Sequence, residues 1–121
     1  MTQNKTIEIT RLPEFNKDLK KLAKRFGTIE ADLDLFCRNV IYLYHVDEVK
    51  NPAIKRIAGL GVETSLYKAV RFACRGLGGG SQSGIRVIYA FFEGPPMRAE
   101  LVEISYKGEM ENQDRIRRRY G

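Results

Sequence analysis

The sequence predicts an α+β fold with the element order β-α-α-β-β-β, followed by a short basic helix or a frayed tail. Three observations lead to this fold class. One alternating apolar segment lies at the start, two segments carry apolar residues at helical spacing, and three later segments are rich in β-branched and aromatic residues. We therefore expect an antiparallel-rich sheet of about four strands with two helices packed on one face.

The first two elements are separated by a proline. Residues 6–12 alternate between apolar and polar side chains, which is typical of a half-buried strand. Pro13 ends this strand and favours the first turn of a helix over 13–26. Gly27 stands where a glycine would end that helix.

A second helix is predicted over residues 28–44. Thr28 is a suitable N-cap, and acidic residues follow early, where the helix dipole favours them. Its apolar stripe consists of Ile29, Leu33, Phe36, Val40 and Tyr44. Residues 45–64 are expected to form a long connection, in which Ile54, Ile57 and Leu60 have the spacing of at most one short helical turn.

The remaining strands are predicted over 66–74, 85–92 and 98–106. Glycine and serine dominate residues 76–84, which indicates a flexible hairpin loop, since the lysine ending of a phosphate-binding loop is lacking. Gly94-Pro95-Pro96 predicts the next turn. Residues 112–120 form the short basic helix or frayed tail.

Composition indicates one folded domain over residues 1–121, without an apolar run of the ~20 residues that a membrane span requires. We expect a soluble, cytoplasmic protein, because the first residues also lack the apolar core of a signal peptide. The net charge of +6 and pI of about 9.5 point to an anionic partner. Charge alone does not choose among nucleic acid, anionic membrane and acidic protein.

Cysteine and histidine are scarce. Cys37 and Cys74 are far apart and belong to no CxxC pair, and His45 is the single histidine. This usage disfavours a disulfide framework and a zinc site, so we expect no metal and no cofactor.

Cations gather in the predicted hairpin. Between residues 64 and 90 the chain contains four cations and no acid: Lys68, Arg71, Arg75 and Arg86. Strand alternation assigns Val87, Tyr89 and Phe91 to the helix-covered face, which leaves Arg86 on an open face. The same reasoning, with Val70, Phe72 and Cys74 towards the core, places Arg71 beside it, and Glu103, Ser105 and Lys107 join from the last strand.

Such a cluster has two interpretations. Guanidinium groups bind phosphate oxygens in a bidentate manner and stabilise the charge that develops during phosphodiester cleavage. Alternatively, these are surface arginines without a specific role. Glu103 is a candidate general base or a salt-bridge partner of Arg71 or Arg86. Lys20 and Lys24 lie on a helix face that is either simply solvated or in contact with RNA.

The hairpin also carries a resemblance. The run Tyr67-Lys-Ala-Val-Arg-Phe72, the glycine-rich loop and the strand Ser83-Gly-Ile-Arg-Val-Ile-Tyr89 resemble the central hairpin of RelE/ParE-type toxins. The ending Ile104-Ser-Tyr-Lys-Gly-Glu-Met-Glu-Asn112 is similar to that of one branch of the superfamily. The element order agrees as well, so the resemblance covers roughly the whole chain. Residues 45–64 are longer than a minimal member needs.

The resemblance implies a RelE-like fold and a toxin that cleaves mRNA on the ribosome without metal, by attack of a ribose 2′-hydroxyl on the adjacent phosphate. The family's strand arginine corresponds to Arg86, and its preceding basic residue to Arg71 or Lys68, of which alternation favours Arg71. Its C-terminal pair corresponds to Tyr106 and Lys107. We therefore expect catalytic residues at Arg71, Arg86, Glu103, Tyr106 and Lys107, and RNA contacts at Lys68, Arg75, Lys20, Lys24, Arg117 and Arg118.

The expected partners are a cognate antitoxin, forming a toxin–antitoxin hetero-oligomer, together with mRNA and the ribosome, and no membrane. Two other functions share these features. A ParE-like toxin would inhibit DNA gyrase through protein contacts, and a non-catalytic module would only bind nucleic acid. The basic cluster favours the ribonuclease over both.

Overall fold

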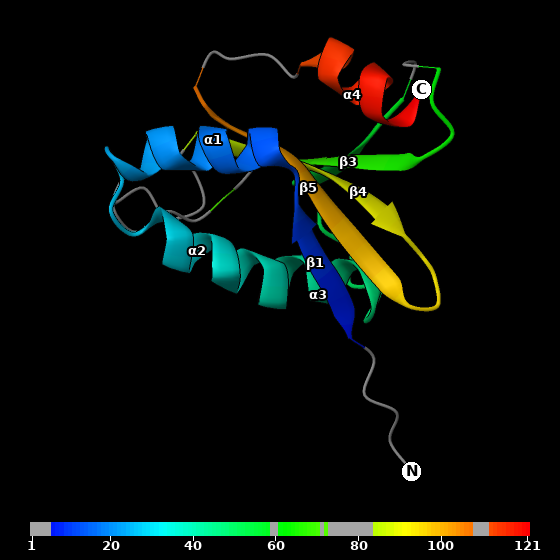
Figure 1. Ribbon diagram of the computed structural model, residues 1–121. Coiled ribbons are helices and arrows are strands. Elements are labelled where there is room, and N and C mark those ends of the chain that lie inside the picture. Colours follow the sequence, from blue (N-terminus) through cyan, green and yellow to red (C-terminus); the bar gives the residue numbers. More distant parts are fainter. Residues whose placement is uncertain (1–5, 59–60, 71, 73–83, 108–111) are drawn as a thin grey trace.

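A five-stranded sheet with helices on both faces forms the core of the chain (Figure 1). The structure is a computed structural model that describes residues 6–58, 61–70, 72, 84–107 and 112–121. Its elements are β1 (Ile7–Arg11), α1 (Pro13–Ala23), α2 (Ile29–Leu35), a π-helical segment (Phe36–Ile41), α3 (Tyr42–His45), β2 (Ile54–Ile57), β3 (Ser65–Ala69), β4 (Ile85–Phe92), β5 (Met97–Tyr106) and α4 (Gln113–Tyr120). The α+β class is confirmed.

The sheet is mixed, with the strand order β1-β5-β4-β3-β2. The pairs β2–β3, β3–β4 and β4–β5 are antiparallel, whereas β1 runs parallel to β5. The N-terminal strand therefore pairs with the last strand, and β1 and β2 form the two edges. Alternation within a strand carries no information on the direction of its neighbour, so the parallel pair was not predicted.

The predicted connection over 45–64 was wrong at one place, because it contains the strand β2. Ile54 is buried and pairs opposite Ala69, while Ile57 is half-buried and pairs opposite Leu66. A spacing of three favoured a helical turn, but the two isoleucines lie on opposite faces of an edge strand. The sheet consequently has five strands rather than about four.

The two long helices were predicted in nearly the right places. α1 ends at Ala23, three residues before the predicted end, and the chain turns so that the Phe26 ring lies 5.0 Å from that of Tyr106. The second helix is continuous from α2 to α3, with the π-helical segment between them. Such a segment holds one extra residue per turn and shifts the apolar stripe, so that Ile41 is fully buried.

One face of the sheet is packed against α2, the π-helical segment and α3. Val87, Tyr89 and Phe91 of β4 point towards these helices, as predicted, and all three are buried. The His45 ring of α3 stacks on Phe91 with 3.8 Å between ring centroids. The rings of Phe36 and Phe72 form a tilted pair with 5.4 Å between centroids. We call this the helix face.

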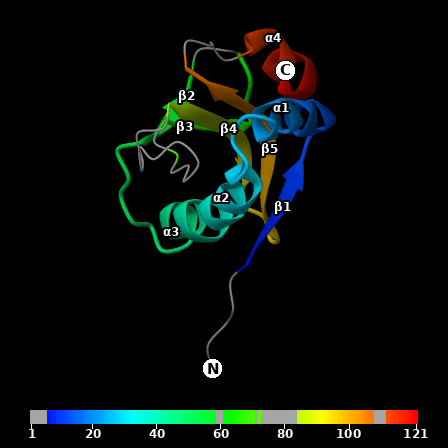
Figure 2. The ribbon, with the colours of Figure 1, turned by 90° about the vertical axis from the view of Figure 1, so that its left-hand side faces the viewer.

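The opposite face was predicted to be open, which was wrong for the part that α4 covers. We call it the polar face, because Glu100, Glu103 and Ser105 of β5 lie on it and are nevertheless buried. The 112–120 segment is therefore a docked helix rather than a frayed tail. Helix α1 lies between α2 and α4, next to β5 (Figures 1 and 2).

A β-bulge in β5 determines which acids reach the polar face. Ile88 pairs with Glu103, but the next residue, Tyr89, pairs with Leu101, so Val102 is the extra residue. Because of this shift, Glu100 and Glu103 share a face although they are three positions apart. Regular alternation would have separated them.

The predicted turn between the last two strands is confirmed. β4 ends at Phe92 and β5 begins at Met97. Gly94 has φ +76°, and a Cβ at this position would lie 2.1 Å from the backbone of Pro96. The turn therefore requires glycine.

Candidate functional site

Lys68 and Arg86 lie next to each other on the polar face. Lys68 of β3 pairs opposite Ile88 of β4, and Arg86 precedes Ile88 by two residues on the same face. Diagonal neighbours of this kind are within reach of long side chains, with Cα atoms about 7–8 Å apart. Both residues are half-buried. The sheet thus places a lysine and an arginine on neighbouring strands of one face.

The preference for Arg71 over Lys68 rested on an incorrect register. It assumed that Val70 lies on the helix face, but Tyr67 and Ala69 pair opposite Tyr89 and Val87 and so lie there instead. The described strand also ends at Ala69 rather than at residue 74. Lys68 is therefore the cation of β3 that shares a face with Arg86. The predicted sites Arg71 and Arg75, and Cys74, lie outside the described residues.

Glu103 completes a row across the polar face, since it pairs opposite Ile88, which in turn pairs opposite Lys68. Its carboxylate accepts a hydrogen bond from the Asn112 backbone N–H at 3.0 Å. Arg115 Nη1 lies 3.9 Å from the same oxygen. Arg115, which the sequence analysis did not consider, is thus an ion-pair partner of Glu103. These contacts tie the carboxylate to the start of α4.

Tyr106, which the resemblance pairs with Lys107, is not part of this row. It pairs opposite Ile85 and lies on the helix face, where its ring contacts Phe26. Lys107 follows it, is exposed, and has its Nζ 5.6 Å from the Tyr106 ring. The Lys107 stem packs on Gly84, where a Cβ would approach it to 2.7 Å. The residue of β5 that pairs opposite Arg86 on the polar face is Ser105.

Helix α4 is held on the polar face by a second acid, Glu100. Arg119 donates two hydrogen bonds to its carboxylate at 3.2 and 3.1 Å, and the Tyr120 hydroxyl donates a third at 2.5 Å. Burial acts to raise the pKa of Glu100, but these hydrogen bonds outweigh it and hold the pKa below its usual value. Burial and the same carboxylate raise the pKa of Tyr120. Sequence reasoning missed Glu100 because the bulge at Val102 reverses its side.

A third contact joins α4 to α1. Arg115 Nη1 lies 2.8 Å from Asp18 Oδ2 of α1, and both side chains are largely buried. The same nitrogen donates to the Val102 carbonyl oxygen at 3.2 Å. Arg115 therefore links α1, β5 and α4 at one point.

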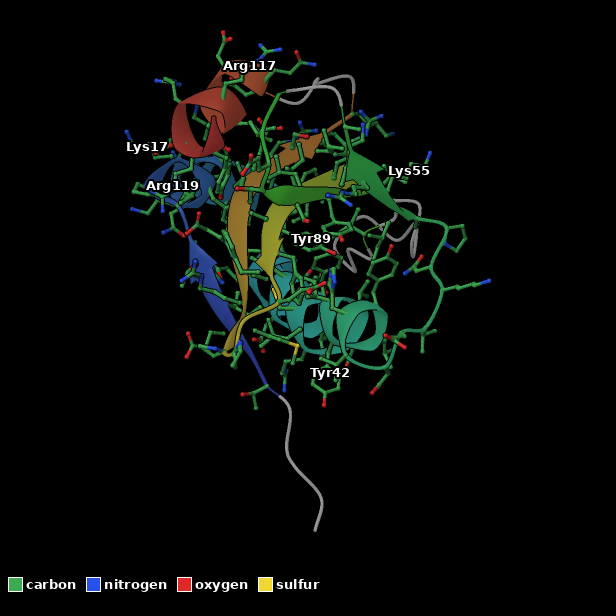
Figure 3. The ribbon with its side chains drawn as sticks, turned by 90° about the vertical axis from the view of Figure 1, so that its right-hand side faces the viewer. Lys17, Tyr42, Lys55, Tyr89, Arg117 and Arg119 are labelled. Atoms are coloured by element: carbon green, nitrogen blue, oxygen red, sulfur yellow. The ribbon has the colours of Figure 1, made fainter. Side chains whose placement is uncertain are left out.

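The predicted RNA-contacting residues on the two helices are exposed. Lys20 lies on α1 and Lys24 directly follows it as the C-cap residue, and Arg117 and Arg118 lie on α4. Figure 3 shows Lys17 and Arg117, which neighbour them, on the same side of the molecule. The contact between α1 and α4 brings these two groups of cations together.

His45 lies on the helix face, whereas Lys68 and Arg86 lie on the polar face. Its Nε2 is hydrogen bonded to the buried Tyr89 hydroxyl at 2.9 Å (Tyr89 is labelled in Figure 3). Burial lowers the pKa of His45 to about 4 and raises that of Tyr89. The imidazole is therefore neutral at pH 7 and is part of an aromatic cluster with Tyr44, Tyr67 and Phe91.

A cavity of about 400 Å³ lies between β1 and the second helix, where Ile7, Ile9 and Arg11 face Asp34, Cys37 and Tyr42. Burial raises the pKa of the Cys37 thiol to about 11, against the opposing effect of Arg11. The thiol is therefore protonated at neutral pH and is a poor nucleophile.

No family model, no curated protein and no solved structure matches the chain. Within the described ranges, no three His, Cys, Asp or Glu side chains gather as metal ligands would. None of the helices in the described part of the chain combines the length and apolar character needed to cross a bilayer.

Proposed function

We propose that this chain is the toxin of a type II toxin–antitoxin pair and that it cleaves mRNA without a metal ion. The observation that carries the proposal is the side-by-side placement of Lys68 and Arg86 on one face of neighbouring strands. These are two of the positions at which the resemblance to RelE-type toxins expects basic residues. The mRNA, the ribosome and a cognate antitoxin are the corresponding partners.

The chemistry of this pair suits phosphodiester cleavage. Attack of a ribose 2′-hydroxyl on the adjacent phosphate adds negative charge at phosphorus, and cations fixed beforehand stabilise that charge more than they stabilise the substrate. Arg86 supplies a planar, always charged fork for two phosphate oxygens. Lys68 supplies a compact charge from the adjacent strand. Strand pairing holds the backbones of both residues in register.

The element order also supports the proposal. The chain follows the order β-α-α-β-β-β-α that the resemblance implies, with β2 added in the segment that was already noted as long. The RelE-like fold itself belongs to the proposal. In this order the central hairpin consists of β3 and β4, which carry Lys68 and Arg86.

One observation favours a second function, that of a nucleic-acid-binding protein without catalysis. Glu103, the candidate base, is buried and held by Arg115 and the Asn112 N–H, and Tyr106 lies on the other face. Glu103 could accept a proton from a substrate hydroxyl only if α4 left the sheet. Without such a movement, the polar face offers cations but no accessible base.

Induced expression separates these functions. We expect growth arrest within minutes and cleavage of messages at ribosome-bound codons, mapped by primer extension. Arg86→Ala should abolish both, whereas Lys50→Ala, a control lysine in the exposed segment after α3, should retain both. Arrest with intact messages and blocked supercoiling would identify a gyrase inhibitor. Binding to RNA without arrest or cleavage would establish the non-catalytic alternative.

A further inference from the structure

Four lysines form a continuous stripe on the exposed side of α1. Lys17, Lys20, Lys21 and Lys24 follow the spacing i, i+3, i+4, i+7, which places them on one side of a helix. All four are exposed. The opposite side of α1 is fixed in the core by Phe15 and Leu19. The stripe therefore has a constant orientation relative to the sheet.

Helix α4 extends this stripe with Arg117 and Arg118, which are also exposed. The ion pair between Asp18 and Arg115, at 2.8 Å, joins the two helices at one point. It also gives the acid Asp18, which lies beside the lysines, a cationic partner. In Figures 1 and 2, α4 lies next to α1 on the side away from α2.

We call the resulting region the α1–α4 basic surface, defined by Lys17, Lys20, Lys21, Lys24, Arg117 and Arg118. In Figure 3, Lys17 and Arg117 lie on one side of the molecule and Lys55 on the other. The surface is thus separate from the edge of the sheet at β2. A cationic area of this kind requires an anionic partner.

The side chains around this surface indicate which anion it fits. Among the described residues, the large apolar side chains that are exposed are Ile9, Leu35, Leu43 and Val49, and none of them belongs to α1 or α4. A bilayer-binding helix would present aromatic or aliphatic residues beside its lysines. A surface for single strands would present aromatic rings on which bases stack. Two exposed acids border the α1–α4 basic surface, Glu14 before Lys17 and Asp114, whose carboxylate lies 3.9 Å from Arg117. The surface itself is strongly cationic and has no exposed large apolar side chain, which suits the sugar–phosphate backbone of a double helix.

We propose that the α1–α4 basic surface binds the phosphate backbone of double-helical RNA and thereby docks the protein beside its substrate. The choice of RNA over DNA rests on the proposed function, since helical segments of ribosomal RNA would surround an mRNA that is cleaved on the ribosome. The binding itself rests on the arrangement of the six cations. Docking and chemistry then use different residues.

The test is binding of the intact protein to a fluorescent RNA hairpin, measured by anisotropy at several salt concentrations. The variant Lys20→Glu with Lys24→Glu should weaken binding by about tenfold or more and reduce the slope of log K against log salt by roughly two. The matched control, Arg38→Glu with Lys50→Glu, has the same net charge but changes exposed residues outside both helices. It should bind almost as tightly as the unaltered chain. Equal weakening by both variants would show that net charge alone is responsible and would overturn the proposal.

Three other ligands complete the test. A single strand of equal length and anionic phospholipid vesicles should both bind more weakly than the RNA hairpin, and either one binding more tightly would refute a duplex-specific surface. A DNA hairpin that binds more tightly than the RNA hairpin would refute the assignment to RNA. Arg86→Ala should bind the hairpin with nearly unchanged affinity. If that variant also cleaves normally, the proposed function fails while the docking surface stands.

Discussion

The two faces of the sheet are built from different chemistry. The helix face buries aromatic and aliphatic side chains such as Tyr89 and Phe91 against a continuous helix. The polar face buries two acids, Glu100 and Glu103, and covers them with a short helix that has one fully buried apolar residue, Ile116. Apolar packing is non-directional, whereas ion pairs depend on pH and salt. The helix face therefore rests mainly on apolar packing, whereas the attachment of α4 to the polar face rests mainly on ion pairs and hydrogen bonds.

Truncating the helix face should have the largest effect of all on stability. Leu33 is fully buried in α2, and Leu33→Ala should lower the free energy of unfolding by about 2–5 kcal/mol, because it removes apolar contacts and leaves a cavity. Urea denaturation followed by circular dichroism measures this loss. If the two faces are separate in function, the folded fraction of the variant should cleave RNA at the normal rate. A cleavage defect in the folded protein would show that the two faces are not separate in function.

Arg86→Ala is the corresponding change on the polar face. It should lower single-turnover cleavage on programmed ribosomes by about a hundredfold or more, because it removes a donor that stabilises charge developing on the phosphate. Arg86→Lys should restore only part of the rate, since an ammonium lacks the planar fork. Unfolding in urea should change little in either variant. A variant that cleaves normally but binds poorly would make Arg86 a docking residue.

Arg115→Ala tests the attachment of α4. Removing this guanidinium takes an ion-pair partner from both Asp18 and Glu103, and we expect a loss of roughly 1–3 kcal/mol, given the partial burial of the pairs. Hydrogen exchange should accelerate at the amides of α4 and remain slow in α2. Arg118→Ala is the control, because that side chain is exposed. Uniform acceleration across both helices would show that α4 is not a separate unit.

Acid should weaken the two faces in sequence, which is the smallest effect we predict. The pKa of His45 is lowered to about 4 in the folded protein, so the unfolded chain binds the proton first, and stability falls as pH drops from about 6.5 to 4. The pKa of Glu100 is also lowered, so its contribution is lost only as pH falls further, below the ordinary carboxyl range. His45→Gln should flatten the first part of the stability curve, and Glu100→Gln the second. If His45→Gln leaves the slope between pH 6.5 and 4 intact, another group is responsible.

The sequence was sufficient for elements whose pattern is local. The strand 85–92 was predicted with its correct bounds, and the two helices with errors of a few residues, since apolar periodicity and the flanking Pro13 and Gly94 determine them. β2 was missed because an edge strand of four residues with two isoleucines three apart matches a helical turn equally well. Sequence alone does not distinguish such cases.

The candidate site was harder to predict because it depends on register. The one-residue bulge at Val102 brings Glu100 to the side of Glu103. In β3, Tyr67 and Ala69 lie on the helix face, so Lys68 shares a face with Arg86. A change of one residue in register moves a side chain to the other face. The helix pairing through Asp18 and Arg115 is likewise invisible in the sequence, because 97 positions separate the two residues.

The parallel pairing of β1 with β5 has a consequence for how the chain is made. Ile7 pairs with Met97, 90 positions later, so β1 is synthesised well before its partner strand β5. At a translation rate of about 5–20 residues per second, this interval lasts roughly 5–18 seconds. During that time β1 has no strand partner and Glu103 has not yet been made. A nascent chain therefore cannot complete this sheet until β5 has been synthesised. A chain that terminates before β5 keeps β1 unpaired, and such a fragment is a substrate for proteases.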